Sequence, residues 1–475
     1  MKGARAQYEA ALASYRQIGA RLGEANVLQA LGDLLLREDD LKGARERYEA
    51  ALASYRQIGD RLGEANVLQA LGDLLLREDD LKGARAQYEA ALASYRQIGD
   101  RLGEANTLRA LGNLALAEKR IEDAVRQCSE AATIYQAIND RLGLAGALGY
   151  LARALRAAGQ PAQAVLYGEA ALGLLRAIGE RFGQCLALGD QGDALYELRL
   201  AEPAFAAWWQ ALALAQHVSP PTAQRLTDVF DQIRRALGDA KFDELVACLN
   251  QDAEGIRLAG VQVAQAQQAR AAALAAANEL FEAKRYDEAR AAFQRIVDAL
   301  PDDADALNGL GNALESLGRY AEALEAYSRA VMAQPGVAML RRNRANLLLR
   351  LGRYDEAAQD VAEAVRLEPD HPFTRARQGG LALARGQFAE AQAHFAAAIA
   401  ARPDDSAGWQ ALRALASLGL GEVAAAQQAI AALAPRLDDD DRAEALLWLE
   451  RLVAARLDLA AAAAVIRAAL SAGSG

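Results

Sequence analysis

The chain has 475 residues, a formal net charge of −10, a hydrophobic fraction of 53% and an aromatic fraction of only 6%. Its length is about three times that of a usual domain, which argues against one compact core. The acidic balance argues against a nucleic-acid partner, because phosphate binding needs clustered lysine and arginine.

The first 120 residues repeat one forty-residue unit. Residues 41–80 copy residues 1–40 with four differences, which are Met1/Leu41, Ala6/Glu46, Gln7/Arg47 and Ala20/Asp60, and residues 81–120 continue the series. A fixed period of this size indicates a solenoid, in which each unit packs on its neighbours and the stack forms a long concave surface. We therefore expect a binding protein rather than an enzyme.

Each forty-residue unit is predicted to be a helical hairpin. Within residues 61–98, apolar residues recur mostly at three- and four-residue steps along two stretches, which is typical of two amphipathic helices. Asp79-Asp80 can cap the second helix, because a carboxylate accepts hydrogen bonds from free N–H groups. Gly99-Asp100 ends that helix and begins the next one.

The period changes from 40 to 34 residues after residue 267. Pro301, Pro335, Pro369 and Pro403 lie 34 residues apart, and each is expected to follow the end of a second helix. The sequence predicts a first solenoid at 1–250, a helical joint at 251–267 and a second solenoid at 268–475. The last unit of the first solenoid, from residue 201, departs from the pattern at Trp208-Trp209 and Pro220-Pro221. We expect an alanine-rich capping hairpin at the C-terminal end of the second solenoid.

The pattern of the shorter units resembles the tetratricopeptide repeat family. Residues 304–337 carry the residue types of its motif at Leu310-Gly311, Tyr320, Ala323, Tyr327 and Pro335, and Trp409 falls near its tryptophan position. The longer units resemble the repeats of kinesin light chains, of LGN/Pins spindle-orientation proteins and of many bacterial signalling proteins. The resemblance implies an all-α, right-handed superhelical solenoid of about twelve helical hairpins.

The resemblance also implies which residues face a ligand, because in this family the first helix of each unit lines the concave face. In the second array these positions carry Asn278, Asn308, Asn312, Arg342, Asn343, Asn346 and Arg377. In the first array they carry Asn26, Asp33, Asn66, Asp73, Asn106, Arg109 and Asn113. A row of asparagines can pair with an extended peptide, because an amide both donates and accepts hydrogen bonds.

The family's carboxylate clamp, which grips a C-terminal carboxylate, is matched only in part. Asn312, Asn343 and Arg377 match three of its five positions, whereas Asn308 and Phe373 stand where the clamp has lysines. The loss of two cationic contacts argues against a C-terminal carboxylate as the ligand, although Arg342 could partly compensate. The first groove is polar and acidic at its start and would suit a basic or polar partner.

No catalytic, metal-binding or cofactor motif is apparent. The three histidines and three cysteines are scattered without ligand spacing, and phosphate-loop, nucleophile-elbow and zinc-protease motifs are absent. Unpaired cysteines and the lack of a signal peptide or membrane-length apolar run predict a cytoplasmic protein. The acidic run from Asp438 to Asp441 is interpreted as a solvated helix start.

The sequence therefore predicts a non-catalytic scaffold that binds an extended peptide or a partner helix in its concave groove. One alternative is a sensor segment of a larger bacterial signalling protein that controls an NTPase or protease effector, which a start in the middle of a repeat would favour. Another is a structural protein that self-associates through the ends of the solenoid. No cofactor, nucleic acid or membrane is expected as a partner.

Overall fold

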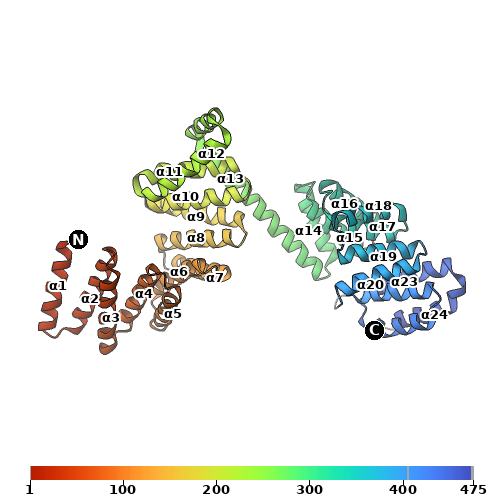
Figure 1. Cartoon of the computed structure of the whole chain (residues 1–475), viewed down its shortest axis with the longest axis horizontal. Coiled ribbons are helices and arrows are strands. Elements are labelled where there is room, and N and C mark those ends of the chain that lie inside the picture. The colour runs from red at the N-terminus through yellow and green to blue at the C-terminus, as the bar shows by residue number, and fades with distance from the viewer. Residues whose placement is uncertain (1, 404–405, 472–475) are drawn as a thin grey trace. The chain divides into compact units, whose positions relative to one another are not determined.

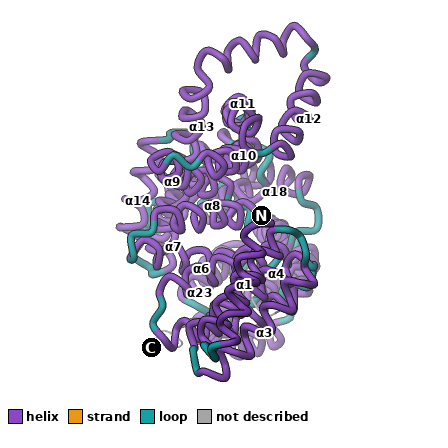
Figure 2. The backbone as a smooth tube through the Cα atoms, turned by 90° about the vertical axis from the view of Figure 1, so that its left-hand side faces the viewer, coloured by secondary structure: helices purple, strands orange, loops and turns teal. Residues whose placement is uncertain are grey.

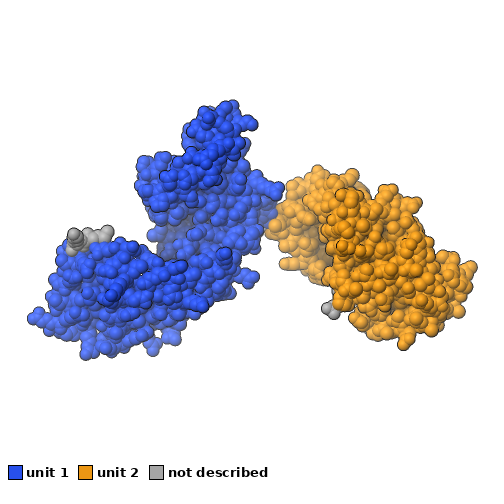
Figure 3. Space-filling view, viewed as in Figure 1, with its two compact units in different colours: residues 1–269 blue, residues 270–475 orange. Residues whose placement is uncertain are grey.

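The computed structural model describes residues 2–403 and 406–471, and these residues are almost entirely helical. Figure 2 shows helices joined by short loops, with no strand in the described part of the chain. The all-α solenoid of about twelve hairpins expected from the sequence is confirmed: the described residues form helices α1 to α24, which follow one another as hairpins (Figure 1). The chain divides into two compact units, residues 1–269 and 270–475 (Figure 3).

The hairpins of the first unit begin and end where the sequence places caps. The carboxylate of Asp80 accepts a hydrogen bond from the N–H of Gly83 at 2.9 Å and begins a second helix. Gly99 ends that helix with a φ of 76°, a left-handed conformation that glycine adopts without strain. The helices are α1 (Lys2–Gln17), α2 (Arg21–Arg37), α3 (Leu41–Ile58), α4 (Arg61–Arg77), α5 (Leu81–Ile98), α6 (Arg101–Ala117), α7 (Ile121–Ala137), α8 (Arg141–Ala157), α9 (Pro161–Ile178), α10 (Arg181–Glu197), α11 (Ala201–Val218), α12 (Pro220–Leu237) and α13 (Asp239–Glu282).

Tyrosine rings packed on glycines join these helices. The ring of Tyr88 in α5 lies against Gly72 of α4, and the ring of Tyr95 lies against Gly103 of α6. Both tyrosines are at most 2% exposed. A Cβ atom at Gly72 would stand 2.5 Å from Cε1 of Tyr88, so only glycine leaves room for the ring. These two rings attach α5 to the first helix before it, α4, and to the first helix after it, α6.

The first helices lie on the inner side of each array. In the first unit α2, α4, α6, α8 and α10 contact one another in succession, whereas α3, α5, α7 and α9 pack mainly on the first helices beside them. In the second unit α17, α19 and α21 form a similar series. A stack whose first helices approach one another more closely than its second helices must curve, with the first helices on the concave side.

The long helix α13 is bent and anchored by a buried arginine. Asp252 has non-helical angles of φ −151° and ψ 54°, and its carboxylate accepts a hydrogen bond from the N–H of Gly255. The Arg257 side chain is fully buried and donates to Gln191 of α10 at 2.7 Å and to Glu254 at 2.8 Å. It also forms an ion pair with Glu169 of α9. The predicted joint, residues 251–267, therefore contains the break in α13 at Asp252, and Arg257 fixes it to α9 and α10.

The second unit continues from residue 270 of α13 with shorter hairpins. Its helices are α14 (Tyr286–Ala299), α15 (Ala304–Ser316), α16 (Tyr320–Ala333), α17 (Ala338–Arg350), α18 (Tyr354–Leu367), α19 (Pro372–Ala384), α20 (Phe388–Ala401), α21 (Ala407–Gly419), α22 (Val423–Leu433), α23 (Asp439–Ala455) and α24 (Ala460–Ser471). Pro301, Pro335, Pro369 and Pro403 each follow the end of a second helix by two residues.

The last hairpin reaches back over the concave side of the second unit. Beyond its contacts with α21, helix α23 approaches the end of α17, where the Arg451 guanidinium donates to the carbonyl oxygens of Leu349 at 2.7 Å and Arg350 at 2.5 Å. Trp448 and Leu449 of α23 are buried in the same core as Leu349. The acidic N-terminal end of α23 consequently faces the groove.

None of the described helices combines the length and the apolar character that a membrane crossing requires.

Candidate functional site

Most of the predicted groove residues of the first unit are bound to tyrosines of the same fold. Tyr48 donates to Asp33 at 2.7 Å and Tyr88 donates to Asp73 at 2.6 Å, in each case from a position 15 residues later. The hydroxyl groups of Tyr55, Tyr95 and Tyr135 donate in the same way to Asn26, Asn66 and Asn106. These five polar side chains therefore hold helices together, whatever else they contact.

The remaining two predicted residues of the first unit lie further along the groove. Asn113 has Cys128 at the position where Asp33 and Asp73 have a tyrosine, so it lacks the corresponding hydroxyl donor. Arg109 lines a pocket of about 320 Å³, together with Arg153, Tyr150 and Asp190. Burial raises the pKa of Asp190 to about 6, although nearby arginines oppose this shift.

The structure separates the predicted residues of the second unit into two groups. Asn278 is exposed on α13, and Arg342 is only 8% exposed because its guanidinium donates to Glu368 at 2.5 Å and to Thr374 at 3.3 Å. Asn308 is also buried and accepts a hydrogen bond from the amide of Asn343 at 2.8 Å. None of Asn278, Asn308 and Arg342 lines the groove pockets described below.

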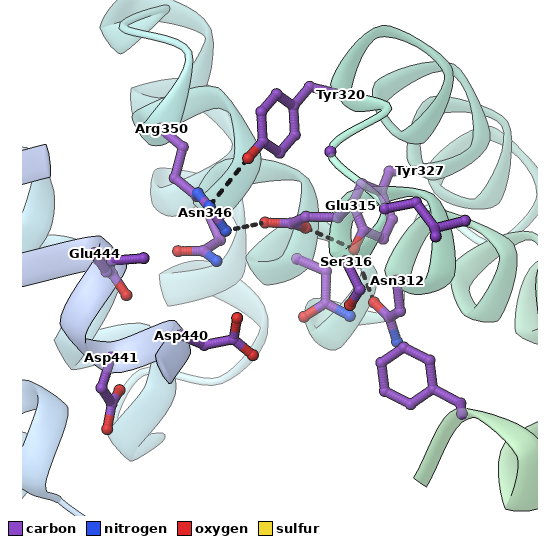
Figure 4. Close-up of a pocket in the computed structure, with 15 residues that line it drawn as sticks. Asn312, Glu315, Ser316, Tyr320, Tyr327, Asn346, Arg350, Asp440, Asp441 and Glu444 are labelled. Atoms are coloured by element: carbon purple, nitrogen blue, oxygen red, sulfur yellow. Dashed lines mark hydrogen bonds and ion pairs between the residues drawn. The ribbon is translucent and has the colours of Figure 1, made fainter. Parts of the chain in front are cut away.

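The other predicted residues meet around the groove pocket, which we define as the cavity of about 560 Å³ between α15, α17 and the start of α23. Asn312 of α15 and Asn343 and Asn346 of α17 supply its amide groups. Figure 4 shows Asn346 on the side of the pocket nearer Asp440 and Glu444 of α23, and Asn312 beside Tyr327 across the pocket. The groove pocket thus combines amides on one wall with carboxylates on the other.

Hydrogen bonds fix the wall formed by α15 and α17. The Tyr327 hydroxyl donates to Asn312 at 2.7 Å and to Glu315 at 2.9 Å. Arg350 donates to the same Glu315 at 3.1 Å and lies over the ring of Tyr320 (Figure 4). Burial raises the pKa of Tyr327 above its usual value, with a smaller contribution from Glu315, so this hydroxyl stays a donor.

Asn346 differs from Asn312 in having no tyrosine. The residue 15 positions after Asn312 is Tyr327, whereas the residue 15 positions after Asn346 is Val361. The Oδ1 atom of Asn346 is shielded from solvent and accepts no hydrogen bond from the described residues. A buried acceptor without a donor is unfavourable, so this amide is suited to a bond with a ligand.

Arg377 lies in a neighbouring pocket of about 520 Å³ on the other side of the α23 terminus. That pocket also contains Phe373, Trp409 and the carboxylates of Asp438, Asp441 and Glu444. Burial lowers the pKa of the Arg377 guanidinium, while Glu444 and Glu315 oppose this shift. The Nε atom of Arg377 is buried and donates to none of the described residues.

The sequence analysis did not predict that carboxylates of α23 line the groove pocket. We call these residues, Asp440, Asp441 and Glu444, the acidic wall. Asp438 does cap α23, because its carboxylate accepts from the N–H of Asp441 at 2.8 Å. The run from Asp438 to Asp441 is a helix start whose side chains are exposed or half-buried, as expected, and Asp440 and Asp441 together with Glu444 also line the groove pocket. Arg350 was also missed. Within the described residues, histidine, cysteine and acidic side chains form no group of three or more that could hold a metal ion.

Comparisons with known proteins agree with this architecture. Family models described as tetratricopeptide repeat match residues 274–338, 317–372 and 348–416. A search of curated proteins gave no match.

Solved structures with similar folds include BtubC (BKLC) from P. vanneervenii, at 17% identity and a TM-score of 0.42, over 46% of this chain and 91% of that chain. A thermophilic TPR protein of Thermus thermophilus has 22% identity and a TM-score of 0.33, over 38% and 98% of the two chains. PilF of Pseudomonas aeruginosa has 21% identity and a TM-score of 0.32, over 42% and 89%. These values are too low for the neighbours to indicate a shared function.

Proposed function

Because this chain belongs to the tetratricopeptide repeat family, whose models match residues 274–416, we propose that it is a non-catalytic scaffold that binds a peptide segment of a partner protein. Proteins of this family are generally protein-interaction scaffolds. The proposed site is the groove pocket of the second unit, with Asn312, Asn343 and Asn346 as the polar contacts.

The observation that carries this proposal is the unpartnered amide of Asn346. Its acceptor atom is buried, and the tyrosine that satisfies the equivalent Asn312 is replaced by Val361. A peptide backbone N–H or a donor side chain placed in the groove pocket would satisfy it. An extended segment gains affinity from several such contacts, each worth about 1 kcal/mol.

The test is selection of peptides from a phage-displayed random dodecapeptide library on the full chain. Selected peptides are then titrated against wild type, Asn346→Ala and Asn278→Ala. Asn346 makes no hydrogen bond with the residues that the structure describes, so we expect its replacement to leave the fold intact. Asn278 is a matched control, because it stands at the same repeat position but is exposed on α13 outside the groove pocket.

We expect Asn346→Ala to weaken the selected peptides by about three- to tenfold, which corresponds to the loss of one hydrogen bond. The Asn278→Ala control should bind them as wild type does. Peptides that bind wild type and Asn346→Ala equally would contradict the proposed site, and a library that yields no binding peptide would contradict the proposed function.

A further inference from the structure

The acidic end of α23 is a fixed wall of the groove pocket and not a loose terminus. Trp448 is 3% exposed and Leu449 is fully buried, and Arg451 holds the end of α17 through two backbone carbonyl groups. These contacts lie within the two helical turns that follow Glu444. The carboxylates of Asp440 and Glu444 are therefore held opposite α15 and α17.

The charged side chains that line the groove pocket are predominantly acidic. Among the described residues, the pocket is lined by four carboxylates, on Glu315, Asp440, Asp441 and Glu444, and by a single cation, Arg350. Arg350 is already paired with Glu315 at 3.1 Å. The other nearby cation, Arg377, lines the neighbouring pocket, where Glu444 acts on it. The potential inside the groove pocket therefore favours a positive charge.

The polar atoms of the opposite wall also favour a donor over an acceptor. The Oδ1 atom of Asn346 is a buried acceptor without a donor, and Figure 4 shows this amide on the side of the pocket that faces Glu444 and Asp440. The Oδ1 atom of Asn312 accepts from Tyr327 and retains a second lone pair. A lysine ammonium or an arginine guanidinium carries only donors, so it matches both walls.

We propose that the groove pocket receives a lysine or arginine side chain from a basic segment of the partner protein. This inference rests on the proposed peptide-binding function and adds the charge of the partner. A lysine or arginine side chain has the opposite charge to the C-terminal carboxylate that a clamp of lysines, asparagines and arginine would grip. The difference arises because carboxylates of α23 line the same pocket as Asn312 and Asn346. A ligand carboxylate there would be repelled by Asp440 and Glu444.

Fluorescein-labelled hexalysine and hexaglutamate provide the test, with binding to the full chain measured by fluorescence anisotropy at physiological salt. The wild type is compared with Asp440→Asn/Glu444→Gln, which neutralises two carboxylates of the groove pocket. The matched control is Asp302→Asn/Glu390→Gln, which makes the same change of charge at two exposed positions outside both pockets.

We expect wild type to bind hexalysine at least about tenfold more tightly than hexaglutamate. The pocket variant should bind hexalysine about fivefold more weakly than wild type, whereas the control should remain within about twofold of wild type. Equal weakening in both variants would overturn the proposal, because attraction would then come from the overall acidic surface. Tighter binding of hexaglutamate than of hexalysine would overturn it as well.

The peptides selected from the random library separate this inference from the proposed function. Library peptides that depend on Asn346 and are enriched in lysine or arginine support both. Peptides that depend on Asn346 but lack basic residues overturn only the proposed charge of the partner. If all library peptides bind independently of Asn346, the groove pocket is not the site. The inference that the partner segment is basic then fails as well.

Discussion

At the scale of single residues, the paired tyrosine and glycine determine how closely neighbouring helices approach. Gly72 and Tyr88 illustrate the constraint, because the ring occupies the space in which any other residue at position 72 would place its Cβ atom. The same relation holds between Gly311 and Tyr327 in the second unit, where the tyrosine also positions Asn312 and Glu315. The packing of α15 on α16 and the position of polar side chains in the groove pocket thus both depend on the ring of Tyr327.

Replacement of Gly72 by alanine should therefore destabilise the first unit by about 1–3 kcal/mol, because the added methyl group forces the Tyr88 ring to move. Urea unfolding followed by circular dichroism measures the loss. Gly173→Ala is the control, because a Cβ atom at this exposed position of α9 meets no atom within 4 Å. The control should be neutral or stabilising by up to about 1 kcal/mol. Equal destabilisation by both changes would show that the ring contact is not the cause.

Asp190 should make the stability of the first unit depend on pH. Burial raises its pKa to about 6, compared with about 3.9 in an unfolded chain. Between these two values the folded state binds the proton more tightly, so stability falls as pH rises from about 4 to about 6. The stabilisation that protonated Asp190 provides is complete near pH 4 and is lost above about pH 6.

The Asp190→Asn variant should therefore be more stable than wild type at pH 7, by about 1–3 kcal/mol, and equal to it near pH 4. Unfolding in urea at a series of pH values provides the measurement. Asp231→Asn removes an exposed aspartate of α12 and serves as the control. A stability difference between Asp190→Asn and wild type that does not change between pH 4 and pH 7 would contradict the assignment.

At the scale of helices, two arginines attach the less regular elements to the repeats. Arg257 holds α13 against α9 and α10, and Arg451 holds α23 against the end of α17. Hydrogen bonds from Arg257 and Gln191 hold the pKa of Glu169 below its usual value even though burial opposes this. Glu169 is therefore ionised and paired in the folded unit at neutral pH.

Arg257→Ala should cost about 3–5 kcal/mol, because it leaves Glu169 half-buried without its cation. Hydrogen exchange should show reduced protection in α13 near residue 257 and in the facing part of α10. The double variant Arg257→Met/Glu169→Met removes both charges and should recover much of the loss, since a buried ion pair can often be replaced by apolar side chains. If the double variant is as unstable as Arg257→Ala, packing of the arginine and not its charge is the dominant contribution.

At the scale of the whole molecule, the sequence predicts most of the fold and only part of the candidate site. The repeat period, the capping aspartates and the prolines predict the hairpins, because these signals act within a few residues of each helix end. The structure brings Asn312, Asn343 and Asn346 together at one pocket, because their spacing follows from the repeat. Tetratricopeptide repeats were correctly identified from the same periodic signals over residues 274–416, where the family models match.

The acidic wall could not be predicted from the repeat, because it depends on contacts between distant parts of the chain. Arg451 and Leu349 are 102 residues apart in the sequence, and Arg451 lies in the last hairpin, outside the proline-marked units. The burial of Arg342 also depends on a partner, Glu368, that lies outside the expected positions. One local signal was available: Val361, in the place of a tyrosine, indicates that Asn346 is left without its usual donor.

The near identity of the first forty-residue units has a genetic consequence. Equivalent tyrosine rings meet equivalent glycines between the copies, as Tyr48 meets Gly32 and Tyr88 meets Gly72, so the surface that ends one of these repeats fits the surface that begins the next. Recombination between misaligned copies that adds or removes one whole repeat would therefore join two compatible surfaces. The number of copies can change in a single event without any compensating substitution. The length of the array can therefore vary in steps of one repeat.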